Sequence, residues 1–448
     1  MKKLFAAFAL SLLAVAPAAQ AQSILRDAET EALLNDMSRP IIAASGLSPK
    51  DVQIVLVQDD SINAFVAGGQ IVFVHSGTLQ AADNANEVQG VIAHELGHIV
   101  GGHISLADRG IKPAIGIQIL SLVLGIAAAA AGSGEGAAGI IAAGQQAALG
   151  KYLAFSRDQE ASADAAGAKF LNGAGVTGKG YLSFFAKLTR LEARYGITRQ
   201  DSYQLDHPVS TERIANLTET LQDAPSWNKP SDADIELRFQ RVKAKLSGYA
   251  QDPKRTLAQY PPSDQSIFAH YARAYAYHKS GYPDKAATES DLLVKASPDD
   301  PYFLEVKGQI LLEGGQPAAA VPYLRRATEG SNSNPLIATS FGHALIATED
   351  PANFAEAERV LRLAVSRDND NPFAWYQLGV VYERKGDQPR ALLATAARAS
   401  LIGDYRTAAF SARSALAGLP PNSIDWIRAQ DIMIASQNAL QDDPRARR

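Results

Sequence analysis

The sequence predicts a mainly helical α+β domain with a small β-sheet, followed by an all-α solenoid of helical repeats. Two observations support this prediction. Short apolar runs typical of strands precede helical segments in the first half, and Gly and Pro recur at a nearly fixed spacing in the second half. With 448 residues, 46% of them hydrophobic, the chain is long enough for two or three domains with cores of their own.

The composition excludes several classes of site and partner. The chain has no cysteine, so disulfides, Cys-ligated metal centres and thiol catalysis are excluded. The formal net charge is −4, and no block of basic residues interrupts the sequence. This charge pattern argues against nucleic acid as the main partner.

The first 21 residues are predicted to be a secretory signal peptide. Two lysines at positions 2 and 3 precede an apolar run over residues 4–15, and a small-x-small cleavage site ends at Ala21. A short membrane anchor is the alternative, but Pro17 follows the apolar run closely. We therefore expect an exported protein that is cleaved after Ala21 and resides in the periplasm.

Residues 22–250 are predicted to form the first domain. Residues 26–45 should be helical because their apolar side chains share one face, and Pro40 should kink or restart this helix. The next expected elements are two strands, the turn between them and a helix: residues 52–57 and 71–74, Gly68-Gly69, and residues 87–99.

An apolar stretch over residues 115–149 is predicted to form a helical hairpin. Its two runs are separated by a Gly/Ser/Glu break at residues 132–136, and the second run is too short to span a bilayer well. We expect a buried or lid-like helical pair. The alternative is peripheral contact with a membrane surface or an apolar client.

Residues 251–448 carry a repeat of about 34 residues. Proline and glycine recur together at intervals of 34 and 37 residues, at Pro301, Pro335 and Pro372 and at Gly308, Gly342 and Gly379. The clearest unit, Trp375-x-x-Leu378-Gly379-x-x-Tyr382, matches the tetratricopeptide pattern. Because one unit cannot bury its apolar face alone, the units should stack as a solenoid with a concave face. An unrelated helical domain is the alternative.

The segment His94-Glu95-Leu96-Gly97-His98 is a candidate metal site. On a helix, residues i and i+4 lie on one face, so both imidazoles can reach one zinc ion. Glu95 is placed to accept a proton from a water molecule held there. The alternative is a pair of structural helix histidines.

A third ligand is expected at Glu160. His103 is nearer in sequence, but it lies about 140° around the helix from His98 and is therefore expected to be structural. Glu160 and Asp164 are one helical turn apart, so one carboxylate can bind the metal while the other accepts a hydrogen bond from a ligand histidine. The alternative is a solvated acidic face.

These segments resemble a known family. His94-Glu95-x-x-His98 followed by Glu160-x-x-Ala163-Asp164 resembles the gluzincin peptidases of the HtpX and CAAX-prenyl-protease type, including exported members with a C-terminal tetratricopeptide domain. The resemblance extends to Asn63-Ala64-Phe65 with Gly68-Gly69 before the metal helix, and to His207-Pro208 with Glu212-Arg213-Ile214 after it.

The resemblance implies a zinc peptidase with one zinc ion per chain. It implies that His94, His98 and Glu160 bind the zinc ion, that Glu95 is the general base and later the general acid, and that Asp164 supports a ligand histidine.

The resemblance also implies an exposed edge strand near residues 70–74, with Gly69, Ile71 and Phe73 as its substrate-pairing positions. The alternative for this strand is an ordinary paired strand of the core.

His207 has three interpretations. It could donate a hydrogen bond to the oxyanion of the tetrahedral intermediate. It could instead occupy the open zinc position and hold the enzyme shut until a substrate displaces it. It could also be a structural residue at the start of a helix.

Two function hypotheses follow. The first is a zinc endopeptidase that cleaves unfolded or misassembled envelope proteins, with the repeats recruiting clients or the outer-membrane β-barrel assembly machinery. The second is a tetratricopeptide chaperone or adaptor for outer-membrane protein assembly whose metal site is gated or idle. A purely structural envelope scaffold is disfavoured because the ligand set and the base are both present.

Overall fold

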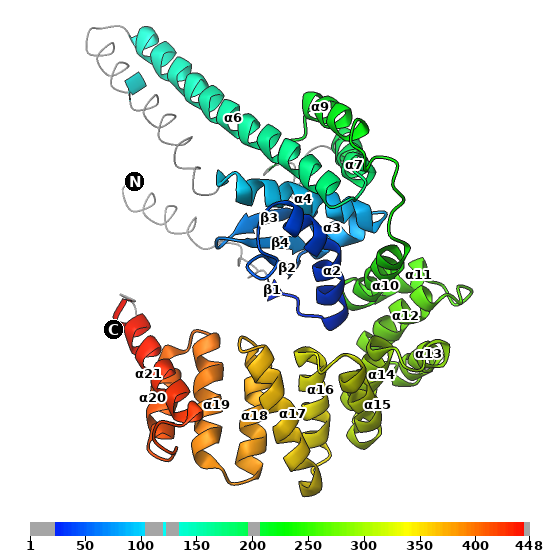
Figure 1. Cartoon of the computed structure of the whole chain (residues 1–448), viewed down its shortest axis with the longest axis vertical. Coiled ribbons are helices and arrows are strands. Elements are labelled where there is room, and N and C mark those ends of the chain that lie inside the picture. The colour runs from blue at the N-terminus through cyan, green and yellow to red at the C-terminus, as the bar shows by residue number, and fades with distance from the viewer. Residues whose placement is uncertain (1–22, 104–119, 122–133, 196–206, 443–448) are drawn as a thin grey trace, which may run out of the picture. The chain divides into compact units, whose positions relative to one another are not determined.

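The computed structural model describes residues 23–103, 120–121, 134–195 and 207–442. The chain divides into two compact units (Figure 1). The first comprises Met1–Leu25 and Leu33–Phe239, and the second comprises Arg26–Ala32 and Gln240–Arg448. The predicted signal peptide lies outside the described residues.

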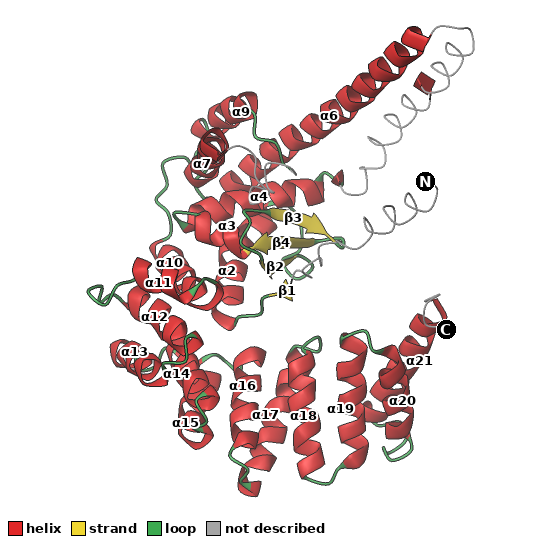
Figure 2. Cartoon of the chain, turned by 180° about the vertical axis from the view of Figure 1, so that it is seen from behind, coloured by secondary structure: helices red, strands yellow, loops and turns green. Residues whose placement is uncertain are grey.

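A four-stranded sheet forms the β part of the first unit (Figure 2). Its spatial order is β1-β2-β4-β3, with β2 and β4 parallel and the other neighbours antiparallel. The strands are β1 (Ser23–Ile24), β2 (Gln53–Gln58), β3 (Ala64–Ala67) and β4 (Ile71–His75).

The predicted edge strand is wrong. The strand that carries Ile71 and Phe73 is β4, which pairs with β2 on one side and with β3 on the other. Gly68 and Gly69 adopt φ values of 61° and 97°, a left-handed conformation that lets the chain turn tightly and fold β3 back onto β4. Gly69 therefore belongs to the turn, and within the described residues the free edge on this side of the sheet is β3.

Helices surround the sheet in the first unit, and α10 continues into the second unit. They are α2 (Ala28–Ala44), α3 (Ser76–Ala81), α4 (Ala85–Val100), α6 (Gly134–Gly173), α7 (Lys179–Tyr195), α9 (Thr211–Gln222) and α10 (Ala233–Ala250). The helix predicted over residues 26–45 is α2, which continues through Pro40 without the restart expected there.

Helix α4 begins at a reciprocal cap. The Asn84 side chain accepts a hydrogen bond from the Glu87 backbone N–H at 3.0 Å, and the Glu87 carboxylate accepts one from the Asp83 N–H at 2.9 Å. Such a cap satisfies N–H groups that have no partner within the helix. It also fixes where the helix that carries His94 and His98 starts.

Helices α4 and α6 lie side by side (Figure 1), and their backbones approach closely at two glycines. A Cβ atom at Gly97 would lie 2.6 Å from the Ala163 carbonyl oxygen, and one at Gly167 would lie 3.1 Å from the Ala93 carbonyl oxygen. The two glycines therefore allow a backbone approach that a larger residue would prevent. This approach brings the carboxylates of α6 to the histidines of α4.

The predicted hairpin over residues 115–149 lies partly outside the described residues, which omit 104–119 and 122–133. Its second run is the N-terminal part of α6, a helix that continues to Gly173. Ser121 lies against Gly144 of this helix, whereas Leu120 is 60% exposed. None of the helices within the described residues has the length and hydropathy needed to cross a membrane.

The second unit is an array of consecutive helices that pack side by side, as the predicted tetratricopeptide solenoid requires (Figure 1). The repeated glycines lie where paired helices approach, since a Cβ atom at Gly308 or Gly342 would lie 2.5 Å from Leu324 or Leu361. The helices are α11 (Pro253–Gln259), α12 (Ile267–Lys279), α13 (Pro283–Ala296), α14 (Pro301–Glu313), α15 (Pro317–Gly330), α16 (Pro335–Ala347), the 3₁₀ turn η2 (Pro351–Asn353), α17 (Phe354–Arg367), α18 (Pro372–Arg384), α19 (Gln388–Leu401), α20 (Tyr405–Leu416) and α21 (Ile424–Asp442).

Candidate metal centre

Four buried side chains from distant parts of the sequence converge beside the sheet. His94 and His98 come from α4, Glu160 comes from α6, and His207 comes from the segment before α9. One donor atom from each residue lies within 4.8 Å of every other. The structure thus brings together all three predicted metal ligands and adds His207 as a fourth potential donor.

The spacing of these donor atoms suits a tetrahedral metal ion. The Nε2 atoms of His94 and His98 are 3.1 Å apart, and each lies 3.3–3.4 Å from a Glu160 oxygen. The Nδ1 atom of His207 lies 3.1 Å from Glu160 Oε1 and 3.3 Å from His94 Nε2. Ligand atoms held 2.0–2.1 Å from a tetrahedral zinc ion are about 3.3 Å apart, so the four residues fit the group.

Glu95 occupies the position predicted for the general base. It is fully buried on α4 between the two histidines, and its Oε1 atom lies 3.6 Å from His207 Nε2. Its carboxylate therefore lies beside the donor group, where it can accept a proton from an attacking water molecule.

The far side of His94 is held by a second layer of hydrogen bonds. Its Nδ1 atom lies 3.0 Å from Asp164 Oδ1 and 2.9 Å from the Tyr181 hydroxyl. Tyr181 also donates to Asp164 at 2.7 Å. Because Nδ1 is engaged in this way, Nε2 is left facing the other donor atoms, as a metal ligand requires.

Arg213 connects the two carboxylates of α6. Its guanidinium donates to both oxygens of Asp164 at 2.7 and 2.8 Å, and its Nη1 atom lies 3.0 Å from Glu160 Oε2. All three side chains are buried. Buried carboxylates are stable only when a cation compensates them, and Arg213 supplies that charge.

The environment shifts the pKa values of these groups. Burial raises the pKa of Asp164 and of Glu160, but hydrogen bonds outweigh burial: those from Arg213 and His94 lower the Asp164 pKa to about 2, and those from His207 and His94 hold the Glu160 pKa well below its usual value. Burial and the charges of His94 and His207 lower the pKa of His98 to about 2. Both carboxylates of α6 are therefore ionised at neutral pH.

Sequence reasoning assigns no role in this site to Tyr181 or Arg213. Tyr181 has no recognisable motif, and Arg213 enters only as part of a resemblance. His103 is expected to be structural. His103 is not one of the four donors, but its Nδ1 atom lies 2.9 Å from Nδ1 of His98, on the side of that ring away from the donor group. It is thus placed to orient His98.

Comparison with known proteins agrees with this geometry. The profile of peptidase family M48 matches residues 26–221. This segment is a peptidase family M48 domain. The predicted metalloendopeptidase is thereby confirmed, and the metal site described above lies within the M48 domain.

Relatives extend the similarity beyond the M48 domain. The "Beta-barrel assembly-enhancing protease" of Yersinia pestis is 24% identical over 380 residues, which cover 83% of this chain and 76% of that protein. "Metalloprotease LoiP" of Escherichia coli strain K12 is 32% identical over 176 residues, 39% of this chain and 63% of that protein. The match to the solved structure of YrrB, a tetratricopeptide protein, covers 39% of this chain and 91% of the YrrB chain, at 23% identity and a TM-score of 0.32.

Replacing Arg213 by Met should weaken metal binding about 10- to 100-fold, because Asp164 and Glu160 lose the cation that holds both carboxylates in place. Arg213→Lys keeps the positive charge but loses the bidentate contact with Asp164. Its metal affinity should lie between those of the parent and of Arg213→Met. Metal affinity would be measured by competition with a coloured chelator. The control is Arg190→Met on the exposed side of α7. Unchanged affinity in Arg213→Met would contradict the role given to Arg213.

Proposed function

We propose that this chain is an exported zinc endopeptidase of the periplasm that hydrolyses peptide bonds in unfolded or stalled envelope proteins. The observation that carries the proposal is the set of four buried donor atoms at tetrahedral spacing, with Glu95 beside them. The relatives named as β-barrel assembly-enhancing proteases support a role in outer-membrane protein quality control. The solenoid is then the part that recruits clients or assembly machinery.

The residues of the site divide the chemical work. A bound zinc ion would act as a Lewis acid that activates water and polarises the scissile carbonyl. Glu95 would accept the proton of the attacking water and then deliver it to the leaving amine nitrogen. Asp164 and Tyr181 would keep His94 in the tautomer that presents Nε2 to the ion.

Replacement of Glu95 by Gln should abolish hydrolysis of an unfolded polypeptide, by at least about 10²-fold, while zinc remains bound at one equivalent. Glu160→Gln should lower both zinc content and activity, because it weakens a ligand. Zinc would be measured by atomic emission and cleavage by gel, with and without a chelator. If Glu160→Gln retained both zinc and full activity, the third ligand would be a different residue.

His207 is proposed to close the site in the absence of substrate. Its Nδ1 atom already lies at ligand spacing from Glu160 and His94, so it fills the position that a substrate carbonyl or water would need. This arrangement also supports the second candidate function, a chaperone or adaptor whose metal site stays shut until a client arrives.

His207→Ala should therefore raise the rate of peptide cleavage several-fold, because the fourth donor position becomes open. His278→Ala in the second unit is a matched control and should leave the rate unchanged. The readout is the initial rate on an unfolded protein at equal zinc occupancy. A decrease of about 10²- to 10³-fold would instead assign His207 to stabilisation of the oxyanion.

The free edge of β3 is proposed to pair with the substrate backbone. β3 packs against α4, the helix that carries His94 and His98. The His75 N–H donates to the Asn63 carbonyl at 3.0 Å. Since successive residues of a strand face opposite sides, the peptide groups of Phe65 face β4 and those of Val66 face the free edge. Main-chain pairing of this kind tolerates many substrate sequences.

Val66→Pro should raise KM for an unfolded substrate about 3- to 10-fold, because proline removes an N–H that points away from β4 and leaves the pairing of β3 with β4 intact. Val66→Ala keeps that N–H and serves as the control. Zinc content should be equal in both variants. Equal KM values in the two variants would show that substrate does not pair with β3.

A further inference from the structure

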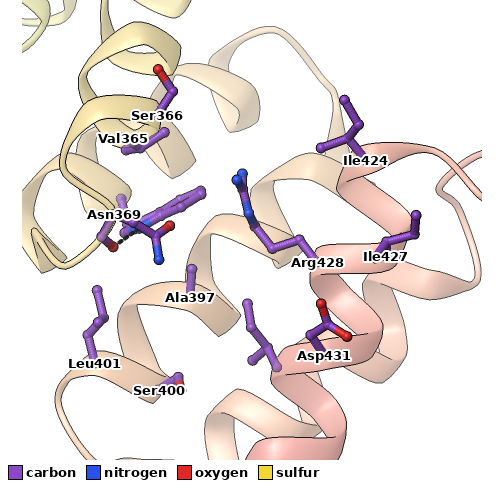
Figure 3. A pocket seen from close by; sticks show the side chains of 12 residues that line it. Val365, Ser366, Asn369, Ala397, Ser400, Leu401, Ile424, Ile427, Arg428 and Asp431 are labelled. Carbon is purple, nitrogen blue, oxygen red and sulfur yellow. Dashed lines mark hydrogen bonds between the residues drawn. The ribbon is translucent and has the colours of Figure 1, made fainter.

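A cavity of about 470 Å³ lies in the second unit, between α17, α19 and α21 (Figure 3). It is separate in sequence from the metal centre, and its volume is in the range that binds small ligands or short peptide segments. Part of its wall is apolar: Val365, Leu401, Ile424, Ile427 and Ile432.

A fixed cation lies in this cavity. The guanidinium of Arg428 lies 5.2 Å from the ring centroid of Trp375. The ring is itself fixed, because its Nε1 donates to the Asn369 carbonyl at 2.9 Å. Within the described residues, Arg428 makes no ion pair, whereas the nearby Arg390 pairs with Asp425. Arg428 is thus oriented by an aromatic face and retains its hydrogen-bond donors for a ligand.

The cavity is lined by polar side chains and bordered by exposed apolar ones. Asn369 and Arg428 both project into it, from the loop before α18 and from α21 (Figure 3). Two isoleucines border it and are unusually exposed: Ile424 is 78% and Ile427 is 47% exposed. Exposed apolar side chains beside a cation that makes no ion pair within the described residues indicate a ligand that carries both an apolar group and a negative charge.

We propose that this cavity binds the free carboxyl terminus of an extended polypeptide whose last side chain is apolar. Such a residue supplies both features at once: its α-carboxylate can accept a forked pair of hydrogen bonds from Arg428, and its side chain can cover Ile424 and Ile427. The Asn369 amide is placed to donate a further hydrogen bond to the carboxylate.

Asp431 provides an acceptor for the backbone of the bound peptide. It lines the same cavity as Arg428 and makes no ion pair within the described residues. Its carboxylate can accept hydrogen bonds from backbone N–H groups of a peptide, and it disfavours a ligand with more acidic groups than the one carboxylate that Arg428 can pair. The binding mode uses residues of the second unit only and goes beyond the peptidase activity proposed above.

The test measures binding to the full mature chain that carries Glu95→Gln, so that the probe is not cut. The probe is a fluorescent peptide of about ten residues, made of Gly and Ser and ending in Leu-Phe with a free carboxylate. A peptide with the same sequence and a C-terminal amide is its matched partner. Fluorescence anisotropy should show at least about 10-fold weaker binding of the amide, since it lacks the charge that Arg428 recognises.

Arg428→Met should weaken binding of the free acid at least about 10-fold and leave binding of the amide unchanged, while Arg413→Met on the exposed side of α20 should bind as the parent does. Arg428→Lys, which keeps the charge, should retain part of the preference for the acid, and circular dichroism would confirm that each variant is folded. Equal affinity for acid and amide, or no effect of Arg428→Met, would overturn the proposal. So would binding that appears only after residues 443–448 are removed, because that segment of the chain would then be the occupant.

Discussion

The close approach of α4 and α6 is the constraint on which the metal centre depends. Gly97 lies one helical turn after His94, on the side of α4 that approaches the backbone of Ala163, three residues after Glu160. At that distance a carboxylate side chain from α6 reaches the imidazoles of α4 directly. A larger residue at position 97 would separate the helices and move Glu160 away from both histidines, although every ligand would still be present in the sequence. The glycine of the motif is therefore as necessary as its histidines.

Charge balance explains why so many ionisable groups can be buried together. Glu95, Glu160 and Asp164 are carboxylates with almost no exposure, and Arg213 is the one guanidinium that pairs with them among the described residues. Two negative charges would remain, which is the charge that a divalent cation neutralises. Without a metal ion, a proton can provide part of the compensation, since hydrogen bonds to Asp164 and Glu160 outweigh burial and raise the pKa of His94 to about 9. A proton on Nε2 of His94 would occupy the lone pair that a metal ion needs, so a proton and a metal ion would compete at this atom.

The sequence predicted those parts of the site that local spacing encodes. His94 and His98 are one turn apart on a helix, as are Glu160 and Asp164, and both pairs lie in the helices expected for them. Tyr181 could not be predicted in this way, because its position depends on Gly90, where α7 approaches α4 so closely that a Cβ atom would lie 2.6 Å from the Tyr181 backbone.

The order of the strands in the sheet could also not be predicted from the local spacing of residues. The apolar run over residues 71–74 predicts a strand, but not which strands flank it. The resemblance implies an edge at residues 70–74, but β3, a short strand that the sequence does not predict, lies outside β4 in the sheet. The solenoid was easier to predict, since each repeat contacts only its neighbours and its glycine positions recur.

The separation of the chain into two units has a consequence for selectivity. Pairing along β3 would recognise main-chain groups, which every unfolded polypeptide presents, so the M48 domain by itself would have little means of choosing among clients. Discrimination must then come from side chains or termini bound elsewhere, and the second unit provides apolar and charged surface for that purpose. Because the two units are covalently joined, a client held by the solenoid would reach the active site at a raised effective concentration, without any stronger contact at the metal centre. A peptidase site that binds substrates weakly and without selectivity would then cleave selectively, because a separate site on the same chain selects the client. A change at Arg428 should accordingly affect which clients are cut, whereas a change at Glu95 should affect whether any are.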